Sequence, residues 1–119
     1  MPPSVLLVDD DPEFRGLARR LLTAAGLGIV GEAETVAAAT AAALDLRPDA
    51  ALVDVGLPDG NGIALAESLT ALPWPVRVVL TSTDADAASP EDVRRSGAGA
   101  FVPKAELLNA PLLQLLSRE

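Results

Sequence analysis

Short apolar runs alternate along the chain with longer segments that carry a helical pattern. The first run, residues 5–8, is continuously apolar and is followed at once by three aspartates. Such a run is typical of a strand that is buried on both faces of a parallel sheet. Comparable runs predict four further strands, over residues 28–33, 50–53, 76–80 and 99–102.

Helix signals fill the segments between these runs. Asp11 and Pro12 supply a cap and a first-turn proline, and the apolar stripe that follows predicts a helix that Gly26 ends. Thr35 is placed to cap an alanine-rich helix that runs to about residue 46. The remaining helices are expected over about residues 63–72, 90–96 and 106–118.

Five strand–helix units predict an α/β fold in which a five-stranded parallel sheet is covered by helices on both faces. Right-handed crossovers then give an open, doubly wound sheet, and its functional crevice lies at the carboxyl ends of the strands. No repeat, linker or shift in composition divides the chain. Residues 1–119 are therefore expected to form a single domain.

Composition narrows the chemistry that this domain can perform. Half of the 119 residues are hydrophobic, and 17 acidic against 9 basic residues give a net charge of −8. This acidity argues against direct nucleic-acid binding, because phosphate backbones require a basic surface. The chain has no cysteine and no histidine, which excludes disulfides, thiolate metal sites and histidine bases. Carboxylates, hydroxyls and one lysine remain.

The location of the protein is also an expectation from the sequence. The first residues do not have the pattern of a signal peptide. No apolar stretch approaches the ~18 residues that a membrane span requires. We therefore expect a cytoplasmic protein that does not interact with membranes.

Polar residues follow the predicted strands at their carboxyl ends. Asp9 and Asp10 follow the first strand, Asp54 the third and Thr81 the fourth, while Lys104 lies just beyond the fifth. These strand ends share one edge of the sheet, so the three carboxylates should lie close together. Clustered carboxylates repel one another, and a hard divalent cation relieves the repulsion. Mg²⁺, held by carboxylate oxygens and water, fits best.

Each of these residues also has an ordinary structural interpretation when it is taken alone. Asp54 fits a strand-terminal aspartate, Lys104 a surface lysine and Thr81 a turn hydroxyl. Asp11, directly before Pro12, is interpreted as a helix cap and not as part of a site. The joint placement of the others at four strand ends is what favours a functional site.

Four segments carry a more specific pattern, at residues 5–11, 52–62, 79–82 and 97–104. Within them, successive separations of 44, 27 and 23 positions lead from Asp10 to Asp54, Thr81 and Lys104. This pattern resembles the receiver domain of two-component response regulators, of the chemotaxis-regulator type. The resemblance covers nearly the whole chain and implies a flavodoxin-like fold with strand order 2-1-3-4-5.

The resemblance also implies a reaction, in which Asp54 accepts a phosphoryl group from a histidine kinase with the help of Mg²⁺. Asp10 would bind the ion directly and Asp9 through a water molecule. Asp54 and the backbone carbonyl of Gly56 would complete the protein ligands. Such a site works by positioning and by neutralising the charge of the phosphoryl oxygens.

A switch is implied by the same resemblance. Thr81 and Lys104 would bind the phosphoryl group, and Phe101 matches the aromatic switch residue of the family. Thr81 would move toward the phosphoryl group and the Phe101 ring would turn inward. The face formed by the fourth helix, fifth strand and fifth helix would then change. Ala105 follows the lysine where many members carry a proline, so a cis peptide there is in question.

The implied function is a phosphorylation-controlled signalling switch and not an enzyme. Its partners would be a histidine kinase and a downstream protein or effector domain, with a homodimer on phosphorylation as a further expectation. One alternative is a receiver that belongs to a longer DNA-binding transcription regulator. The other is a Mg²⁺-dependent phosphohydrolase that forms an aspartyl phosphate. Phosphohydrolases of the haloacid-dehalogenase type carry their nucleophile after the first strand, which leaves Asp54 without a role.

Overall fold

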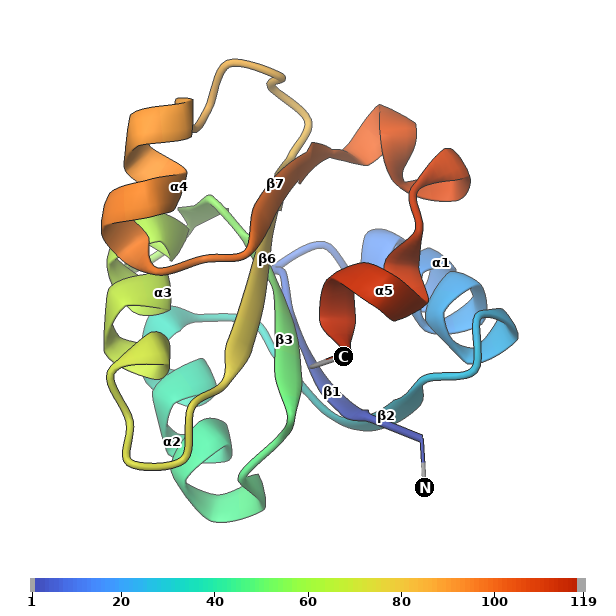
Figure 1. Cartoon of the computed structure of the whole chain (residues 1–119), viewed down its shortest axis with the longest axis horizontal. Coiled ribbons are helices and arrows are strands. Elements are labelled where there is room, and N and C mark those ends of the chain that lie inside the picture. The colour runs from blue at the N-terminus through green and yellow to red at the C-terminus, as the bar shows by residue number, and fades with distance from the viewer. Residues whose placement is uncertain (1, 118–119) are drawn as a thin grey trace.

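The computed structural model describes residues 2–117 and contains a parallel five-stranded sheet (Figure 1). Its strand order is β2-β1-β3-β6-β7, which is the predicted order 2-1-3-4-5. The strands are β1 (Ser4–Val8), β2 (Gly28–Ala33), β3 (Ala50–Asp54), β6 (Arg77–Ser82) and β7 (Ala100–Pro103). The doubly wound α/β fold predicted from the sequence is therefore confirmed.

Helices cover both faces of the sheet. They are α1 (Pro12–Ala24), α2 (Val36–Leu46), α3 (Gly62–Thr70), α4 (Pro90–Ser96) and α5 (Leu112–Leu116). Figure 1 shows α2, α3 and α4 on one side of the sheet and α1 and α5 on the other. The central strands are thus covered on both faces, which explains why their sequences are apolar without alternation.

Two buried clusters fill the layers on either side of the sheet. Within β1, Leu6 and Val8 face the cluster under α2 and α3, whereas Val5 and Leu7 face the cluster under α1 and α5. All four of these side chains are buried. The sheet is therefore held from both sides, and the strand ends at its carboxyl edge are rigidly placed.

The predicted starts of α1, α2 and α4 are confirmed. The side chain of Asp11 accepts a hydrogen bond from the backbone of the first turn of α1, and Thr35 does the same for α2. Ser89 and Asp92 form a reciprocal capping box at α4. These side chains satisfy backbone N–H groups that have no partner within the helix.

The prediction of one continuous helix over about residues 106–118 is wrong. A 3-10 helix, η1 (Lys104–Asn109), ends before Pro111, and the separate short helix α5 follows it. Proline has no N–H to donate, and its ring clashes with the carbonyl four residues earlier, so it interrupts a helix. Residue 118 lies outside the described residues.

Smaller differences concern the ends of strands and one loop. Strand β6 runs to Ser82, so Thr81 is paired within the sheet and does not follow it. The loop after β3 contains a short antiparallel pair, β4 (Gly56–Leu57) and β5 (Gly60–Asn61). All peptide bonds among residues 2–117 are trans, including the one between Lys104 and Ala105. Within the same residues, no helix has the length and apolar character needed to cross a membrane.

Candidate functional site

The register of the sheet brings the predicted site residues to one edge. Val8, the last residue of β1, pairs with Val53 of β3, and Asp54 pairs with Thr81 of β6. Asp9 follows β1 directly, so it emerges beside the end of β3. Parallel pairing therefore places residues that are far apart in the sequence at neighbouring strand ends.

Three carboxylates meet at this edge. One oxygen from each of Asp9, Asp10 and Asp54 lies within 4.8 Å of the others. Asp9 is 2% exposed and Asp54 is 8% exposed, whereas Asp10 is exposed to solvent. Two buried acids and one exposed acid thus form a pocket of negative charge that opens toward solvent.

Asp9 has a different partner for each of its carboxylate oxygens. Oδ1 accepts a hydrogen bond of 2.9 Å from the backbone N–H of Asp11. Oδ2 lies 2.7 Å from Nζ of Lys104 as an ion pair, but it has no well-aligned hydrogen-bond donor among the described residues. The ammonium offsets part of the cost of burying this oxygen, because burial removes the water that would otherwise solvate the carboxylate.

Burial and the neighbouring carboxylate of Asp9 raise the pKa of Asp54. Both effects disfavour the charged form of the side chain. Lys104 acts in the opposite direction, with its Nζ 3.8 Å from Oδ2 of Asp54. The backbone N–H of Gly56 also points at this carboxylate, 3.4 Å from Oδ1. The ionised form of Asp54 is therefore electrostatically disfavoured, and an added positive charge beside the carboxylate would stabilise it.

The predicted switch pair lies on β6, which is next to β3, and on β7, the edge strand beyond it. Thr81 is fully buried, and its hydroxyl donates a hydrogen bond of 2.7 Å to the carbonyl of Val102 in β7. This bond directs the hydroxyl to the neighbouring strand, while the backbone carbonyl of Thr81 accepts from Val55 at 2.9 Å. Phe101 is partly buried and packs against the cluster that includes α3 and the start of α4.

Glycine is required where the loop after β3 turns into α3. A Cβ atom on Gly62 would lie only 2.1 Å from the backbone carbonyl oxygen of Asp54. The N–H of Gly62 donates to the carbonyl of Val55 at 2.7 Å, which closes the loop. The sequence analysis did not single out this residue, because residues 56–62 contain three glycines and no local signal distinguishes them.

Two further residues hold the site and were missed in the sequence. Nη1 of Arg15 donates a hydrogen bond of 2.7 Å to the backbone carbonyl of Asp9, and its Nε pairs with Glu32 at 2.8 Å. Asp59 accepts hydrogen bonds from the first two N–H groups of α2, at 2.7 and 3.1 Å. An arginine on a helix and an aspartate in a loop carry no distinguishing pattern, so only the fold reveals these contacts.

Comparison with known proteins then identifies the arrangement. Residues 5–114 match the response regulator receiver domain family. The chain belongs to this family. The receiver fold, the flavodoxin-like topology and the interpretation as a phosphorylation-controlled signalling module, all expected from the sequence, are thereby confirmed.

Individual receiver relatives extend the comparison. The DNA-binding transcriptional activator DevR/DosR of Mycobacterium tuberculosis is 43% identical over 102 residues, which cover 84% of this chain and 46% of that protein. A protein-glutamate methylesterase/protein-glutamine glutaminase of Halobacterium salinarum is 40% identical over 69% of this chain and 24% of its own length. The signal receiver domain of NarL from Mycobacterium tuberculosis has a TM-score of 0.80 and 30% identity, with 98% of each chain covered.

This receiver spans about half the length of the transcriptional regulators that it matches. The longer relatives differ in what accompanies the matched segment, since some are named as DNA-binding activators and others as enzymes. A receiver domain is in general a signalling module that a histidine kinase phosphorylates and that acts on an effector.

Receiver domains bind Mg²⁺ through an acidic pocket, and the residues present here fit that ion. The donor set consists of carboxylate oxygens, which are the ligands that Mg²⁺ prefers. The buried Oδ2 of Asp9, whose partner among the described residues is the Lys104 ammonium, has no well-aligned hydrogen bond and could accept one from a metal-bound water. A cation would also offset the repulsion between Asp9 and Asp54.

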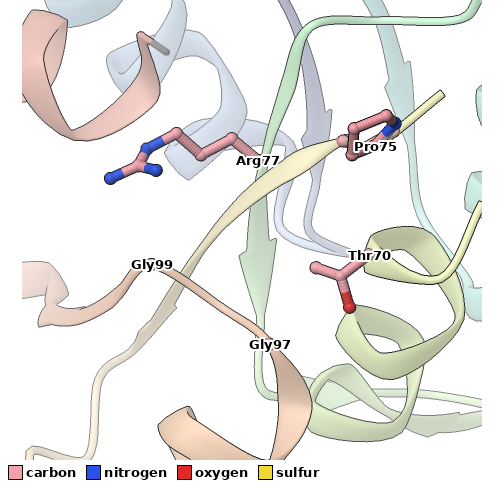
Figure 2. Close-up of a pocket in the computed structure, with 6 residues that line it drawn as sticks. Thr70, Pro75, Arg77, Gly97 and Gly99 are labelled. Atoms are coloured by element: carbon pink, nitrogen blue, oxygen red, sulfur yellow. The ribbon is translucent and has the colours of Figure 1, made fainter. Parts of the chain in front are cut away.

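One cavity among the described residues lies away from the acidic pocket. Figure 2 shows Thr70, Arg77 and Gly97 in its wall. Its volume is about 400 Å³. Arg77 is the first residue of β6, so this cavity lies at the amino end of the strand. The acids lie at the opposite, carboxyl edge of the sheet. This cavity is therefore separate from the acidic pocket.

Proposed function

We propose that Asp54 is the phosphoacceptor of this receiver. In the reaction, a carboxylate oxygen of Asp54 forms a bond to phosphorus while the bond between phosphorus and the histidine nitrogen of the kinase breaks. The observation that carries the proposal is the placement of this buried carboxylate beside the acids Asp9 and Asp10 and within 3.8 Å of the only lysine of the chain. Its neighbours supply the charge that the incoming phosphoryl group requires.

We propose Asp9, Asp10, Asp54 and the backbone carbonyl of Gly56 as the ligands of Mg²⁺, with Asp9 acting through a bound water. The exposed carboxylate of Asp10 is accessible to an ion that enters from solvent, whereas Asp9 is buried and held by Lys104. When bound, the ion neutralises charge on the carboxylates and on the phosphoryl oxygens.

Lys104 and Thr81 are proposed to bind the phosphoryl group after transfer. The ammonium of Lys104 is already 3.8 Å from Oδ2 of Asp54, so an added phosphoryl oxygen would meet it. The hydroxyl of Thr81 must first leave the carbonyl of Val102. Because this hydroxyl can donate only one hydrogen bond at a time, its choice of acceptor links the phosphorylation state to β7.

Output is proposed to leave through the face formed by α4, β7 and the segment of η1 and α5. Phe101 lies on β7 next to Val102, whose carbonyl receives the Thr81 hydroxyl. The proposed partners are a histidine kinase as phosphodonor and a downstream protein or effector domain, with a homodimer on phosphorylation. Residues 1–119 are proposed to act as one domain in this role, without turnover of an independent substrate.

A second candidate is a receiver that forms the regulatory part of a longer transcription regulator. This is favoured by the match to DevR/DosR, of which the chain covers 46%. In that case the effector acted on by the α4–β7–α5 face would be a DNA-binding domain of the same protein. The acidic receiver itself, with a net charge of −8, would not contact the DNA.

The site assignment is tested by labelling with a small phosphodonor, such as acetyl phosphate, with and without Mg²⁺. We expect Mg²⁺-dependent incorporation of phosphate in the parent protein. We expect none in Asp54→Asn, because the side-chain amide of asparagine does not attack phosphorus as a carboxylate does. Asp11→Asn is the matched control, since asparagine retains the cap of α1. Equal labelling of Asp54→Asn and the parent protein would exclude Asp54 as the phosphoacceptor.

A further inference from the structure

The ammonium of Lys104 has a third neighbour besides the two carboxylates. Its Nζ lies 4.1 Å from the centre of the Phe14 ring. The same nitrogen is 2.7 Å from Oδ2 of Asp9 and 3.8 Å from Oδ2 of Asp54. Only 14% of the lysine side chain is exposed. The Phe14 ring thus lies against the ammonium group of Lys104, which also contacts the two carboxylates.

The ring comes from a part of the fold that is distant from the lysine. Phe14 lies in the first turn of α1, directly after the strand end that carries Asp9. Lys104 follows β7, and the sheet order places β3 and β6 between β1 and β7. The lysine side chain therefore reaches across the carboxyl edge of the sheet, and the ring meets it at the far side.

A cation over an aromatic face is attracted by the electron-rich centre of the ring. This attraction differs from the two ion pairs in that it does not involve a carboxylate. A metal ion or a phosphoryl group changes the charge available on Asp9 and Asp54, but it leaves the ring unchanged. The attraction to Phe14 therefore does not depend on the charge of either carboxylate.

We propose that Phe14 is a positioning residue for Lys104. The ring holds the ammonium beside Asp54 while its main partner changes from the carboxylate of Asp9 to the phosphoryl group. Without the ring, the long and flexible lysine side chain would have to be ordered again at each step, with a loss of conformational freedom. The proposal rests on the proposed role of Asp54 and adds a residue outside the acidic pocket.

An ordinary packing role for Phe14 must be separated from this one. The ring also contacts the buried cluster under α1 and α5, so its removal could disturb the fold. Phe14→Leu keeps an apolar side chain there but lacks the aromatic face, and Phe14→Tyr keeps the face. Lys104→Met removes the cation while it retains a long apolar side chain. The single and double variants form a cycle that isolates the coupling of the two residues.

The experiment measures the rate of Mg²⁺-dependent phosphorylation by acetyl phosphate across this cycle. Phe14→Leu should slow the reaction about two- to fivefold when Lys104 is present, which corresponds to the usual strength of such a contact. In the Lys104→Met background it should have no further effect. Phe14→Tyr should retain the parent rate within about twofold. Equal slowing by Phe14→Leu in both backgrounds, or no slowing in either, would overturn the proposal.

A second readout does not depend on phosphorylation. In the parent protein, the side-chain protons of Lys104 next to Nζ should show ring-current shifts, both with Mg²⁺ alone and with Mg²⁺ and beryllofluoride. These shifts should be lost in Phe14→Leu. Their absence from the parent with Mg²⁺ and beryllofluoride would refute the persistent contact. If the parent protein is not labelled at all, the proposed function of Asp54 fails, whereas the shifts still decide whether the ring holds the lysine.

Discussion

The side chain of Asp54 is buried at the end of β3, beside the carboxylate of Asp9 and close to the lysine. Its raised pKa means that the folded protein holds the proton of Asp54 more tightly than the unfolded chain does. The charged form, which would be the nucleophile in the proposed reaction, is therefore the form that the fold stabilises less well. Reactivity and stability oppose each other at this residue.

This opposition predicts that Asp54→Asn stabilises the protein at neutral pH, by on the order of 1 kcal/mol. The ionised parent loses stability as pH rises from the ordinary pKa of 3.8 through the raised folded value, and the variant does not. The gain should thus shrink in acid and also when Mg²⁺ is added. Urea unfolding of both proteins at several pH values measures it. A variant less stable than the parent at pH 7 without metal would contradict the strain argument.

At the residue scale, the sequence revealed the acids, the hydroxyl and the lysine because each stands next to a recognisable apolar strand. It did not reveal Arg15, which acts on a backbone carbonyl, or Phe14, which acts through its ring. Both are on a helix whose apolar and charged positions also serve packing and solvation. Their partners are fixed only by the way α1 crosses the sheet, and that geometry has no local signature in the sequence.

At the scale of elements, the loop after β3 is tied to the start of α2. Asp59 accepts hydrogen bonds from the N–H groups of Val36 and Ala37, while Thr35 accepts from Ala38. The first three donors of the helix are therefore satisfied, two of them by a residue from another element. These bonds lower the pKa of Asp59. The loop that leads away from Asp54 thus gains a fixed attachment.

Asp59→Ala should lower the melting temperature by a few degrees at neutral pH, because two helix N–H groups lose their acceptor. The depressed pKa gives the direction of the pH dependence. The stabilisation is complete above the ordinary value of 3.8 and is lost as pH falls through the lower folded value. Thermal melts of the variant and of Asp86→Ala, which removes the same charge from an exposed loop, provide the comparison. Equal melting temperatures for both variants would show that the hydrogen bonds from α2 to Asp59 do not stabilise the protein.

Element boundaries were predictable where a cap or a break has a clear signature. Ser89 followed by Pro90 marked the start of α4, and the structure has the helix begin there. The break between η1 and α5 was missed, although Pro111 was visible, because the leucine-rich pattern around it favoured a continuous helix. In this case the missing N–H of one proline outweighed the apolar periodicity on both sides.

At the scale of the whole molecule, the sheet connects the site to β7, which is an edge strand. Asp54 pairs with Thr81, and Thr81 pairs with Val102, so adjacent residues on three strands connect the carboxylate to β7. The hydroxyl of Thr81 is the one group of this row that can exchange partners. A phosphoryl group shifts the equilibrium only if Thr81 binds it in one of the two arrangements. The hydrogen bond to Val102 defines the other arrangement.

The most direct test is backbone amide shift mapping with and without beryllofluoride and Mg²⁺, in the parent protein and in Thr81→Ala. In the parent, large shifts should extend beyond the site into residues 82–104, because the Thr81 hydroxyl leaves β7 for the phosphoryl mimic. In Thr81→Ala, beryllofluoride should still bind near Asp54, but the shifts around Phe101 should disappear. Shifts that avoid residues 82–104 in the parent, or that persist unchanged in Thr81→Ala, would contradict the coupling of Asp54 to β7 through this hydroxyl.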